Sequence, residues 1–367
     1  MGRRNQLVLL FALLMLAVAC THKNKNATEG SPDRTHHVFV DMAGRKVVVP
    51  NKIGKILGSS PVGTVLVYTL NPDLLAGWNY QPDPGEMVFI PERYRSLPVL
   101  GGWYGKNNTG NLEIIMSAHP DVLLSSGNIH DVAAADRIQQ QTRIPVVVLD
   151  GALRNLPATY RKLGELTGEV PRANELAGEC ESTLSEIETK IKAIPAEKRR
   201  RYYYAEGPKG LETEPGDGMH TEALDFAGGT NVASVPNQAG YGHAPVSMEQ
   251  LLQWNPEIII TGYDHNSSPG EFYGTVWSSR TWSRIRAVRN GEVYEAPQYP
   301  HNWIDRPPAS NRIIGLKWLA QLFYPESFHY DMRAETAGFY AKFYHVQLSN
   351  EQLNTILSPA TRKHHEH

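Results

Sequence analysis

Three residues in the second half of the chain, Glu206, His243 and His301, are of the types that ligate metal ions. Carboxylate oxygens and imidazole nitrogens suit several divalent transition metals, so these side chains together would form a metal site. Glu206 directly follows one apolar strand pattern, and His301 lies in the segment after another. The alternative stays open that each histidine only hydrogen-bonds a ligand.

The chain contains no motif that is typical of a catalytic site. A glycine-rich phosphate loop and a dinucleotide fingerprint are missing, because Gly216-Asp-Gly218 lacks the rest of that pattern. There is also no Gly-x-Ser-x-Gly nucleophile elbow. We therefore expect a protein that is not an enzyme and needs no cofactor, with a metal-dependent enzyme on the same scaffold as the alternative. The formal net charge of −2 argues against a nucleic-acid-binding protein.

One helix–strand pattern occurs twice. The segment from Asn111 to Leu124 resembles the segment from Ser247 to Ile260 in its capping residue, its early carboxylate, its proline and its apolar strand. Asn111 and Ser247 suit helix N-caps, and the glutamate two positions later in each copy (113 and 249) falls where the helix dipole favours an anion. A unit repeated on both sides of the middle of the chain predicts two similar α/β lobes with a cleft between them.

The remaining periodicity indicates how these lobes are connected. Strand and helix patterns alternate through residues 37–153 and again through residues 199–325, which indicates parallel βα units. Residues 154–198 show only helical spacing, and Pro171 suits the first position of a long helix. We expect an α/β fold with two Rossmann-like lobes, mostly parallel sheets, a long α-helix joining them as a strut, and a ligand cleft between the lobes. Residues 326–367 are predicted to form a helical C-terminal extension with a polar tail.

The predicted elements can be stated by range. A hairpin is expected over 38–49. Strands are expected near 56–59, 75–78, 122–125, 146–149, 202–205, 258–261 and 292–296. Helices are expected near 62–70, 112–118, 132–141, 172–194, 221–227, 248–254, 282–288, 310–322, 334–344 and 350–357.

The N-terminus is typical of an export signal. Two arginines precede an apolar stretch, and small residues lead to Cys20, which matches a bacterial lipobox. We predict a signal peptide over residues 1–20, a lipid on Cys20 and a flexible tether over residues 21–36. An ordinary signal peptide is the alternative. Because a lipidated Cys20 cannot pair with Cys180, the latter is expected to be a buried core thiol.

The mature chain as a whole resembles the substrate-binding proteins of ABC importers, in the iron-siderophore, haem and cobalamin class. The resemblance implies that Glu113 and Glu249, one at the tip of each lobe, pair with arginines of the membrane permease. The alternative is that both glutamates merely favour a helix N-terminus. The stretches that carry the resemblance are Asp41–Pro50, Gly110–Glu113, Pro120–Val122, Ala227–Ala233, Val246–Glu249, Pro256–Ile259 and Asn302–Arg312.

The resemblance also implies a ligand site at the carboxyl ends of the strands, between the lobes. Arg306 is implied to face an anionic group of the ligand, for which a planar guanidinium is suited, while Asp305 beside it could instead hold it in a structural pair. Trp103 and Tyr104 could stack on a bulky ligand or pack beneath their loop. The full set of predicted ligand-binding residues is Tyr80, Trp103, Tyr104, Glu206, His243, His301, Trp303 and Arg306, and weaker candidates are Asn79, Ser126, Asn128, His220, Tyr241, Asp264 and His265.

The expected ligand is a metal chelate, most readily a ferric siderophore-type complex. A free transition-metal ion, haem and cobalamin are the alternatives. Cobalamin is disfavoured because Glu206, His243 and Ser126 stand where cobalamin-binding relatives carry aromatic residues. The implied partners are an ABC permease with its ATPase, the ligand, and a membrane reached through the lipid on Cys20. A monomer is expected, exported and anchored on the periplasmic or outer face. The histidines of the 363–367 tail could bind metal, although a solvated terminus is favoured.

Overall fold

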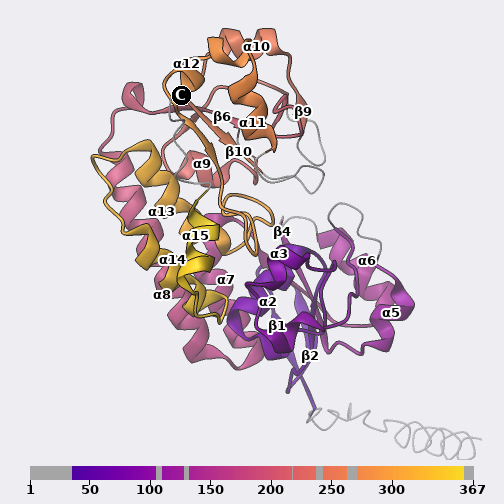
Figure 1. Cartoon of the computed structure of the whole chain (residues 1–367). Helices are drawn as coiled ribbons and strands as arrows, with labels where there is room; N and C mark the ends of the chain where they lie inside the picture. Colours follow the sequence, from indigo (N-terminus) through magenta and orange to yellow (C-terminus); the bar gives the residue numbers. More distant parts are fainter. Residues whose placement is uncertain are drawn as a thin grey trace, which may run out of the picture.

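Two parallel sheets, one in each half of the chain, organise the computed structural model of this protein (Figure 1). The structure describes residues 35–104, 110–127, 132–216, 218–236, 243–262 and 271–358. The predicted signal peptide, Cys20 and the tether up to residue 34 lie outside the described residues, as do Asn128, Tyr241, Asp264, His265 and the histidines of the tail. The predicted two-lobed α/β fold with mostly parallel sheets is confirmed.

The N-terminal lobe is built on a three-stranded parallel sheet in the order β3-β4-β5. All five residues of β5 are buried, as expected for a parallel strand that is covered on both faces. An antiparallel hairpin, β1 with β2, precedes the sheet. The elements are β1 His36–Val40, β2 Lys46–Pro50, β3 Ile56–Gly58, α2 Pro61–Leu70, η1 Pro72–Leu74, α3 Pro84–Met87, α4 Glu92–Arg95, α5 Leu112–Ser117, β4 Val122–Gly127, α6 Val132–Thr142 and β5 Val146–Asp150.

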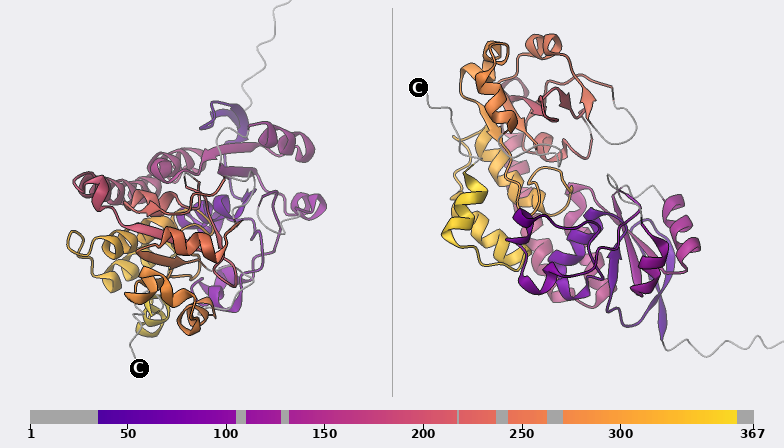
Figure 2. Two further views of the ribbon diagram at one scale, coloured as in Figure 1. Left: turned by 90° about the horizontal axis from the view of Figure 1, so that it is seen from above. Right: turned by 45° about the vertical axis from the view of Figure 1, so that its right-hand side comes forward.

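The strut follows β5 and runs along one side of both lobes (Figure 2). It consists of η2 Leu153–Asn155, α7 Leu156–Thr167, α8 Val170–Lys192 and η3 Ala196–Lys198. Helices α7 and α8 pack so closely that a side chain added at Gly164 would place its Cβ 2.3 Å from the Cβ of Ala173. Cys180 is a free, buried thiol on the apolar face of α8, as predicted.

The C-terminal lobe contains a four-stranded parallel sheet in the order β11-β10-β6-β8 and a small antiparallel pair, β7 with β9. Helices α13 to α15 return along the strut (Figure 1). The elements are β6 Arg201–Ala205, β7 Glu212–Thr213, α9 Glu222–Phe226, β8 Thr230–Asn231, β9 Ala244–Pro245, α10 Met248–Trp254, β10 Ile258–Thr261, α11 Glu271–Ser278, η4 Trp282–Arg284, α12 Arg286–Arg289, β11 Val293–Glu295, α13 Asn311–Phe323, α14 Met332–Phe343 and α15 Asn350–Leu357.

The repeated unit forms equivalent elements in the two lobes, α5 with β4 and α10 with β10. Asn111 caps α5, because its side chain accepts hydrogen bonds from the backbone N–H groups of Glu113 and Ile114. Ser247 caps α10 in a capping box with Gln250. Both predicted N-caps are therefore confirmed.

Two predicted elements differ from the structure. Residues 75–78 do not form a strand, because this segment makes only single bridges, from Leu75 to Ile56 and from Trp78 to Val99. The helix predicted over 282–288 is broken into η4 and α12 by the extended backbone of Ile285. The side chain of Asn255 accepts a hydrogen bond of 2.8 Å from the backbone N–H of Arg286, which supplies α12 with a cap from outside its own sequence.

A buried arginine ties the C-terminal lobe to the start of the strut. Arg312, at the beginning of α13, is fully buried and forms an ion pair of 2.5 Å with Glu222 of α9. Its second terminal nitrogen donates to the carbonyl of Gly151 at 2.6 Å. The Glu222 carboxylate also accepts the backbone N–H of Leu153 at 3.0 Å. These bonds join α13, α9 and the segment that leaves β5.

We expect Arg312→Met to lower the free energy of unfolding by about 3 kcal/mol, because removing one partner of a buried ion pair leaves the other partners uncompensated. Urea denaturation at pH 7 measures this change. The matched control is Arg286→Met, since Arg286 is half exposed and its ion pair of 2.7 Å with Glu257 lies at the surface. That variant should lose less than about 1 kcal/mol. Equal losses in the two variants would contradict the structural role of Arg312.

Candidate functional site

Three glutamates gather at the carboxyl end of β6. The chain reverses between Glu206 and Glu212, whose backbones pair in an isolated antiparallel bridge with N–H to carbonyl distances of 2.8 and 3.1 Å. This reversal requires glycine at Gly207, where φ is +71° and an added Cβ would lie 2.8 Å from the carboxyl carbon of Glu212. Glu214 follows two residues after Glu212, so both side chains project from the same side of the extended segment.

The segment between β11 and α13 contributes the opposite charge. It passes between the two lobes in Figure 1, and Tyr299 within it stacks on Phe89 of the N-terminal lobe at 5.6 Å between ring centroids. Asp305 and Arg306 lie on this segment, which places them at the junction of the lobes. Asp305 is fully buried.

The guanidinium group of Arg306 is surrounded by acidic side chains. Its Nη1 lies 2.6 Å from Oε1 of Glu206 and also contacts Oδ2 of Asp305. Its Nη2 lies 3.2 Å from Oε1 of Glu214 and 3.2 Å from Nε2 of His243. The structural pair with Asp305, which the sequence left as an alternative, is thus formed. Arg306 can meet an anionic group of a ligand only if it gives up some of these contacts.

We call Glu206, Glu212, Glu214, His243, Asp305 and Arg306 the charged cluster. Asp305 links this cluster to two more side chains. The hydroxyl of Tyr204 donates to Oδ1 of Asp305 at 2.7 Å, and Nδ1 of His220 lies 2.9 Å from Oδ2. Burial alone would raise the pKa of Asp305, but the charge of Arg306 and the hydrogen bonds from His220 and Tyr204 hold that pKa below its usual value. Asp305 is therefore ionised at neutral pH.

The pKa of Glu206 shifts in the opposite direction to that of Asp305. Burial raises the pKa of Glu206 well above its usual value, and the charges of Asp305 and Glu214 add to this effect, although Arg306 counteracts it. Glu206 consequently holds a proton more readily than a free glutamate does. The carboxyl groups of Glu206, Glu212, Glu214 and Asp305 outnumber the single guanidinium of the cluster.

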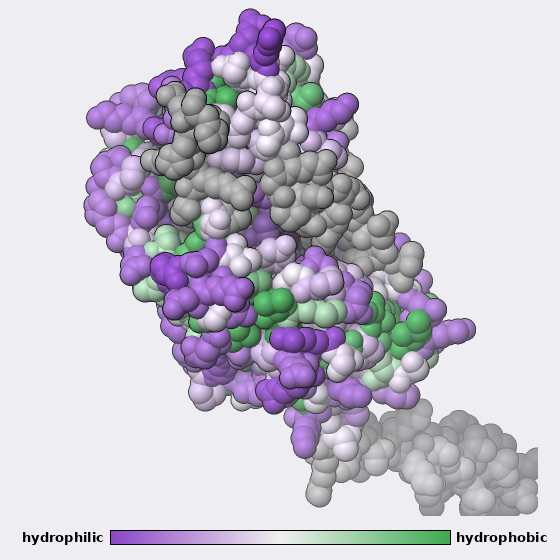
Figure 3. Space-filling model, in the orientation of Figure 1, coloured by the Kyte–Doolittle hydropathy of each residue, from purple (hydrophilic) through white to green (hydrophobic). Residues whose placement is uncertain are grey.

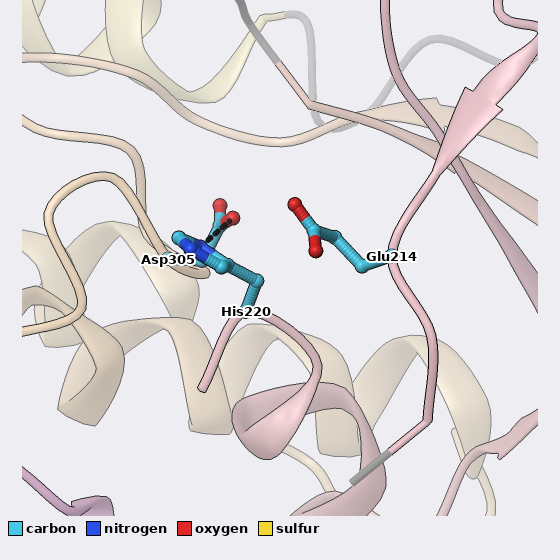
Figure 4. Close-up of side chains that lie close together, drawn as sticks. All are labelled: Glu214, His220 and Asp305. Carbon is cyan, nitrogen blue, oxygen red and sulfur yellow. Dashed lines mark hydrogen bonds and ion pairs between the residues drawn. The ribbon is translucent and has the colours of Figure 1, made fainter. Parts of the chain in front are cut away.

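A set of metal-ligating types converges within the cluster. Glu214, His220 and Asp305 each offer one ligand atom, and these atoms all lie within 4.8 Å of one another. In Figure 4 the Glu214 carboxylate faces the joined side chains of His220 and Asp305 across a short gap. Carboxylate and imidazole ligands suit Zn²⁺, Ni²⁺, Co²⁺ and Mn²⁺. This is the one such group among the residues that the structure describes.

The predicted set of Glu206, His243 and His301 is brought together only in part. His243 lies 4.0 Å from Glu206 and 2.8 Å from Glu212, so both predicted residues belong to the cluster. His301 is instead buried with its ring against Tyr344, at 5.9 Å between centroids, and its Nδ1 has no hydrogen-bond partner in the described part of the chain. His220, a weaker candidate from the sequence, instead joins Glu214 and Asp305 in the group of possible metal ligands.

Trp303 lies in the hydrophobic core. It is fully buried, and its indole N–H donates to the hydroxyl of Tyr340 at 3.2 Å. The structure therefore gives this side chain no surface for contact with a ligand. Its prediction rests on its place in the segment that follows the strand 292–296, but in that segment Trp303 and Ile304 belong to the core, and only Asp305 and Arg306 enter the charged cluster.

The candidates from the N-terminal lobe surround the end of β3. Trp103 and Tyr104 are half-buried and pack against that lobe's core, and their backbone N–H groups both donate to the carbonyl of Ser59. Asn79 is buried and structural, because its amide donates to the carbonyls of Gly58 and Gly101 at 2.8 Å each. Tyr80 is half-buried, and burial together with the charges of two nearby carboxyl groups raises its pKa.

Sequence reasoning missed Glu212 and Glu214 as site residues. A signal was present, since the alternation in Glu212-Thr213-Glu214 would place two carboxylates on one face of a strand. Asp305 was considered only as a partner of Arg306. Its central position depends on Tyr204 and His220, which are about 100 and 85 residues away along the chain.

A separate hollow of about 640 Å³ lies between the α3 region and α15. Phe89, Tyr299 and Gln352 line it, together with exposed residues of α15. None of the side chains of the charged cluster reaches this hollow, so the two features are distinct.

The two predicted docking glutamates are both exposed in the first turn of their helices, Glu113 in α5 and Glu249 in α10. Figure 1 shows these helices on different lobes, α10 at the upper end of the molecule and α5 at the lower right. The apolar side chains of Leu112, Ile114 and Met116 beside Glu113 are between 38 and 48% exposed. Figure 3 shows hydrophobic surface at the right, in the region where Figure 1 places α5.

Two parallel-sheet lobes, a helical strut and a polar cluster at their junction define a two-lobed α/β binding protein rather than an open nucleotide-binding sheet. The chain belongs to the periplasmic binding protein family, whose model matches residues 103–300. Membership in this family implies an extracytoplasmic location. Within the described residues, none of the helices combines the length and apolar character that a membrane span requires.

Individual relatives support this assignment. An ABC transporter solute-binding protein from Sulfurospirillum deleyianum has a solved structure that is 34% identical, with a TM-score of 0.80 and coverage of 88% of this chain and 99% of that chain. The molybdate-binding protein MolA of Haemophilus influenzae is 25% identical over 84% of this chain and 90% of its own length. The Fe(3+)-citrate-binding protein YfmC of Bacillus subtilis is 22% identical over 79% and 87%. These relatives are transport proteins and not enzymes.

We expect the stability of the protein to fall as the pH is lowered, in part because of His301. Burial lowers the pKa of His301 to about 4 from its ordinary 6.5. Between these values the unfolded state binds the proton and the folded state does not, so stability present above pH 6.5 is lost on acidification. By pH 4.5 this contribution amounts to about 2 kcal/mol.

Urea denaturation of the wild type and of His301→Gln at pH 7 and pH 4.5 measures the contribution. The variant should lose about 2 kcal/mol less than the wild type over this interval. Other groups titrate in both proteins, and their effects cancel in the comparison. Glu86, whose pKa is raised to about 7 mainly by burial, acts in the opposite direction in both. Equal losses in the two proteins would contradict a neutral, buried His301.

Proposed function

We propose that this chain is the substrate-binding lipoprotein of an ABC importer and captures a metal complex for delivery to the membrane permease. The observation that carries the proposal is the cluster of carboxylates and imidazoles around Arg306 at the junction of the lobes. A ferric siderophore-type chelate is the class that the sequence predicts. The acidic composition of the cluster supports a ligand that presents a metal centre or another positively charged face to Glu214 and Asp305.

Charge disfavours a simple oxyanion such as the one named for the Haemophilus relative. Recognition of an oxyanion needs cationic or neutral donors that are free to point at it. Here the guanidinium of Arg306 is already engaged by Glu206, Glu214 and Asp305. An oxyanion placed next to it would also lie close to ionised carboxylates, and like charges at such separations repel strongly where water is excluded.

Delivery is proposed to use Glu113 and Glu249. Both are exposed, both stand at the N-terminus of equivalent helices, and one belongs to each lobe. Two charges fixed on separate lobes allow a permease to recognise the relative orientation of the lobes. The lipid on Cys20 would hold the protein at the membrane surface, where its local concentration near the permease is high.

Native mass spectrometry with elemental analysis tests the cargo, using the processed protein purified from its host without chelators. An organic species that carries a metal would support the proposal and identify the ligand. A bound oxyanion without an organic component or a metal cation would contradict it. The same spectrum reports the acyl mass on Cys20, so an unmodified N-terminus would contradict the anchor separately.

We expect Glu113→Gln combined with Glu249→Gln to weaken docking to the permease roughly tenfold while leaving ligand affinity unchanged. Each exposed ion pair is worth about 1 kcal/mol or less, and 1.4 kcal/mol corresponds to a factor of ten. Uptake into proteoliposomes containing the permease, measured against the concentration of loaded binding protein, reports the change. The matched control is Glu181→Gln, an exposed glutamate on α8 that pairs only with Arg161 among the described residues. A normal uptake curve for the double variant would contradict the docking role.

A further inference from the structure

The cluster already contains a cation, and that cation is part of the chain. Arg306 contacts the carboxyl groups of Glu206, Glu214 and Asp305, of which none is more than 3% exposed. A buried carboxyl group stays ionised only when a positive charge or hydrogen-bond donors are beside it, because the desolvation cost of an unpaired carboxylate is several kcal/mol. The guanidinium therefore supplies the charge balance that allows this concentration of acids to be buried.

We propose that Arg306 is an internal counter-cation that occupies the place of a divalent transition-metal ion, and that such an ion displaces it and is held by Glu214, His220 and Asp305. This inference rests on the proposed function, and it takes a divalent ion, bare or partly coordinated, as the metal that the cluster binds instead of a ferric centre. It makes the role of Arg306 competitive with the cargo and not attractive to it.

The positions of the three ligands suit a single ion after a small adjustment. Their ligand atoms lie within 4.8 Å of one another, whereas ligands about 2.1 Å from a tetrahedral ion are about 3.4 Å apart. Rotation of the Glu214 side chain, which Figure 4 shows facing the other two across the gap, would shorten the longer separations. Asp305 and His220 are already adjacent, at 2.9 Å between Oδ2 and Nδ1.

Arg306 and the ion cannot be bound to the same oxygens. Nη1 of Arg306 contacts Oδ2 of Asp305, and Nη2 contacts Oε1 of Glu214. A dication that takes these two carboxylates would repel the guanidinium at close range. It would also compensate the cluster more completely, because two positive charges replace one beside several carboxylates.

The structure offers the displaced guanidinium another partner. His243 lies 3.2 Å from Nη2 of Arg306, and beyond it the carboxylate of Glu212 is 2.8 Å from the other nitrogen of the His243 ring. The Glu212 side chain is 42% exposed, so a guanidinium that moves toward it gains both an acid and contact with solvent. Glu212 and His243 thus form the side of the cluster to which Arg306 can withdraw.

The experiment is isothermal titration of the processed protein, freed of bound ligand, with ZnCl₂, NiCl₂ and MnCl₂ separately. If Arg306 competes with the metal, Arg306→Gln should bind at least one of these ions at least tenfold more tightly than the wild type. Arg306→Lys keeps the positive charge and should stay within about threefold of the wild type. Asp305→Asn should lose at least tenfold in affinity. Arg286→Gln, which removes an exposed arginine of the same lobe, is the matched control and should change nothing.

Because Arg306→Gln leaves buried carboxylates unpaired, thermal unfolding accompanies each titration. The variant should melt at a lower temperature than the wild type without metal and recover more of this loss than the wild type gains when the metal is added. If the single variant fails to fold, Arg306→Gln with Glu206→Gln removes one of the unpaired acids and leaves Glu214, His220 and Asp305 intact. The same increase in metal affinity is expected of this pair.

Unchanged or weaker metal binding by Arg306→Gln and by the double variant would overturn the inference. Loss of the host-derived chelate by Arg306→Gln, with no binding of bare metal by any variant, would show instead that Arg306 anchors an anionic group. That result overturns the internal counter-cation and leaves the proposed function standing. A wild-type protein that binds neither bare metal nor a metal chelate from its host would overturn both.

Discussion

Buried charges must be neutralised, and one short segment of this protein takes part in two such ion pairs. Arg306 compensates the acids at the junction of the lobes, and Arg312 compensates Glu222 where α13 meets the start of the strut. Asp305, on the same segment, orients Tyr204 and His220. The charged pairs link β6, α9, α13 and the end of β5, which also pack together in the hydrophobic core.

The strut limits how far the two lobes can rotate against each other. Helices α7 and α8 pack at contact distance through Gly164 and Ala173, and Arg312 binds the carbonyl of Gly151 at the exit from β5. A large rotation of the C-terminal lobe against the start of the strut would break the hydrogen bond from Arg312, whereas rotation of single side chains such as Arg306 and Glu214 would not. The cargo is therefore expected to be registered first by the charged side chains, with only a small change in the angle between the lobes.

Relatives of similar architecture carry names that specify quite different ligands, from molybdate to Fe(3+)-citrate. The scaffold is common to them, and the ligand is decided by the polar groups at the junction of the lobes. In this chain those groups are predominantly acidic, with two histidines at the margin and one arginine in the middle. Under the proposed function, this composition would favour cations and metal centres over free oxyanions by charge, without a difference in the fold.

The sequence by itself determined the elements whose patterns are local. The N-caps at Asn111 and Ser247, the apolar strands β5 and β10, the long helix with Cys180 on its buried face, and the two-lobed class could all be predicted, because periodicity and capping act over a few residues. It also placed Glu206, His243 and Arg306 among the site candidates. The break at Ile285 was not predictable, since the cap that starts α12 is the distant Asn255.

Only the tertiary structure decided which candidates meet. His301 and Trp303 stand beside Asp305 in sequence, yet one packs against Tyr344 and the other lies in the core. Glu214 and His220 lie between β7 and α9, and Asp305 lies between β11 and α13, yet their ligand atoms converge within 4.8 Å. Glu206, Glu214 and Asp305 share Arg306. The physical reason is that the charge of a buried group is balanced by whatever lies beside it in space. This charge balance depends on the packing of the two lobes and cannot be predicted from any single segment of the chain.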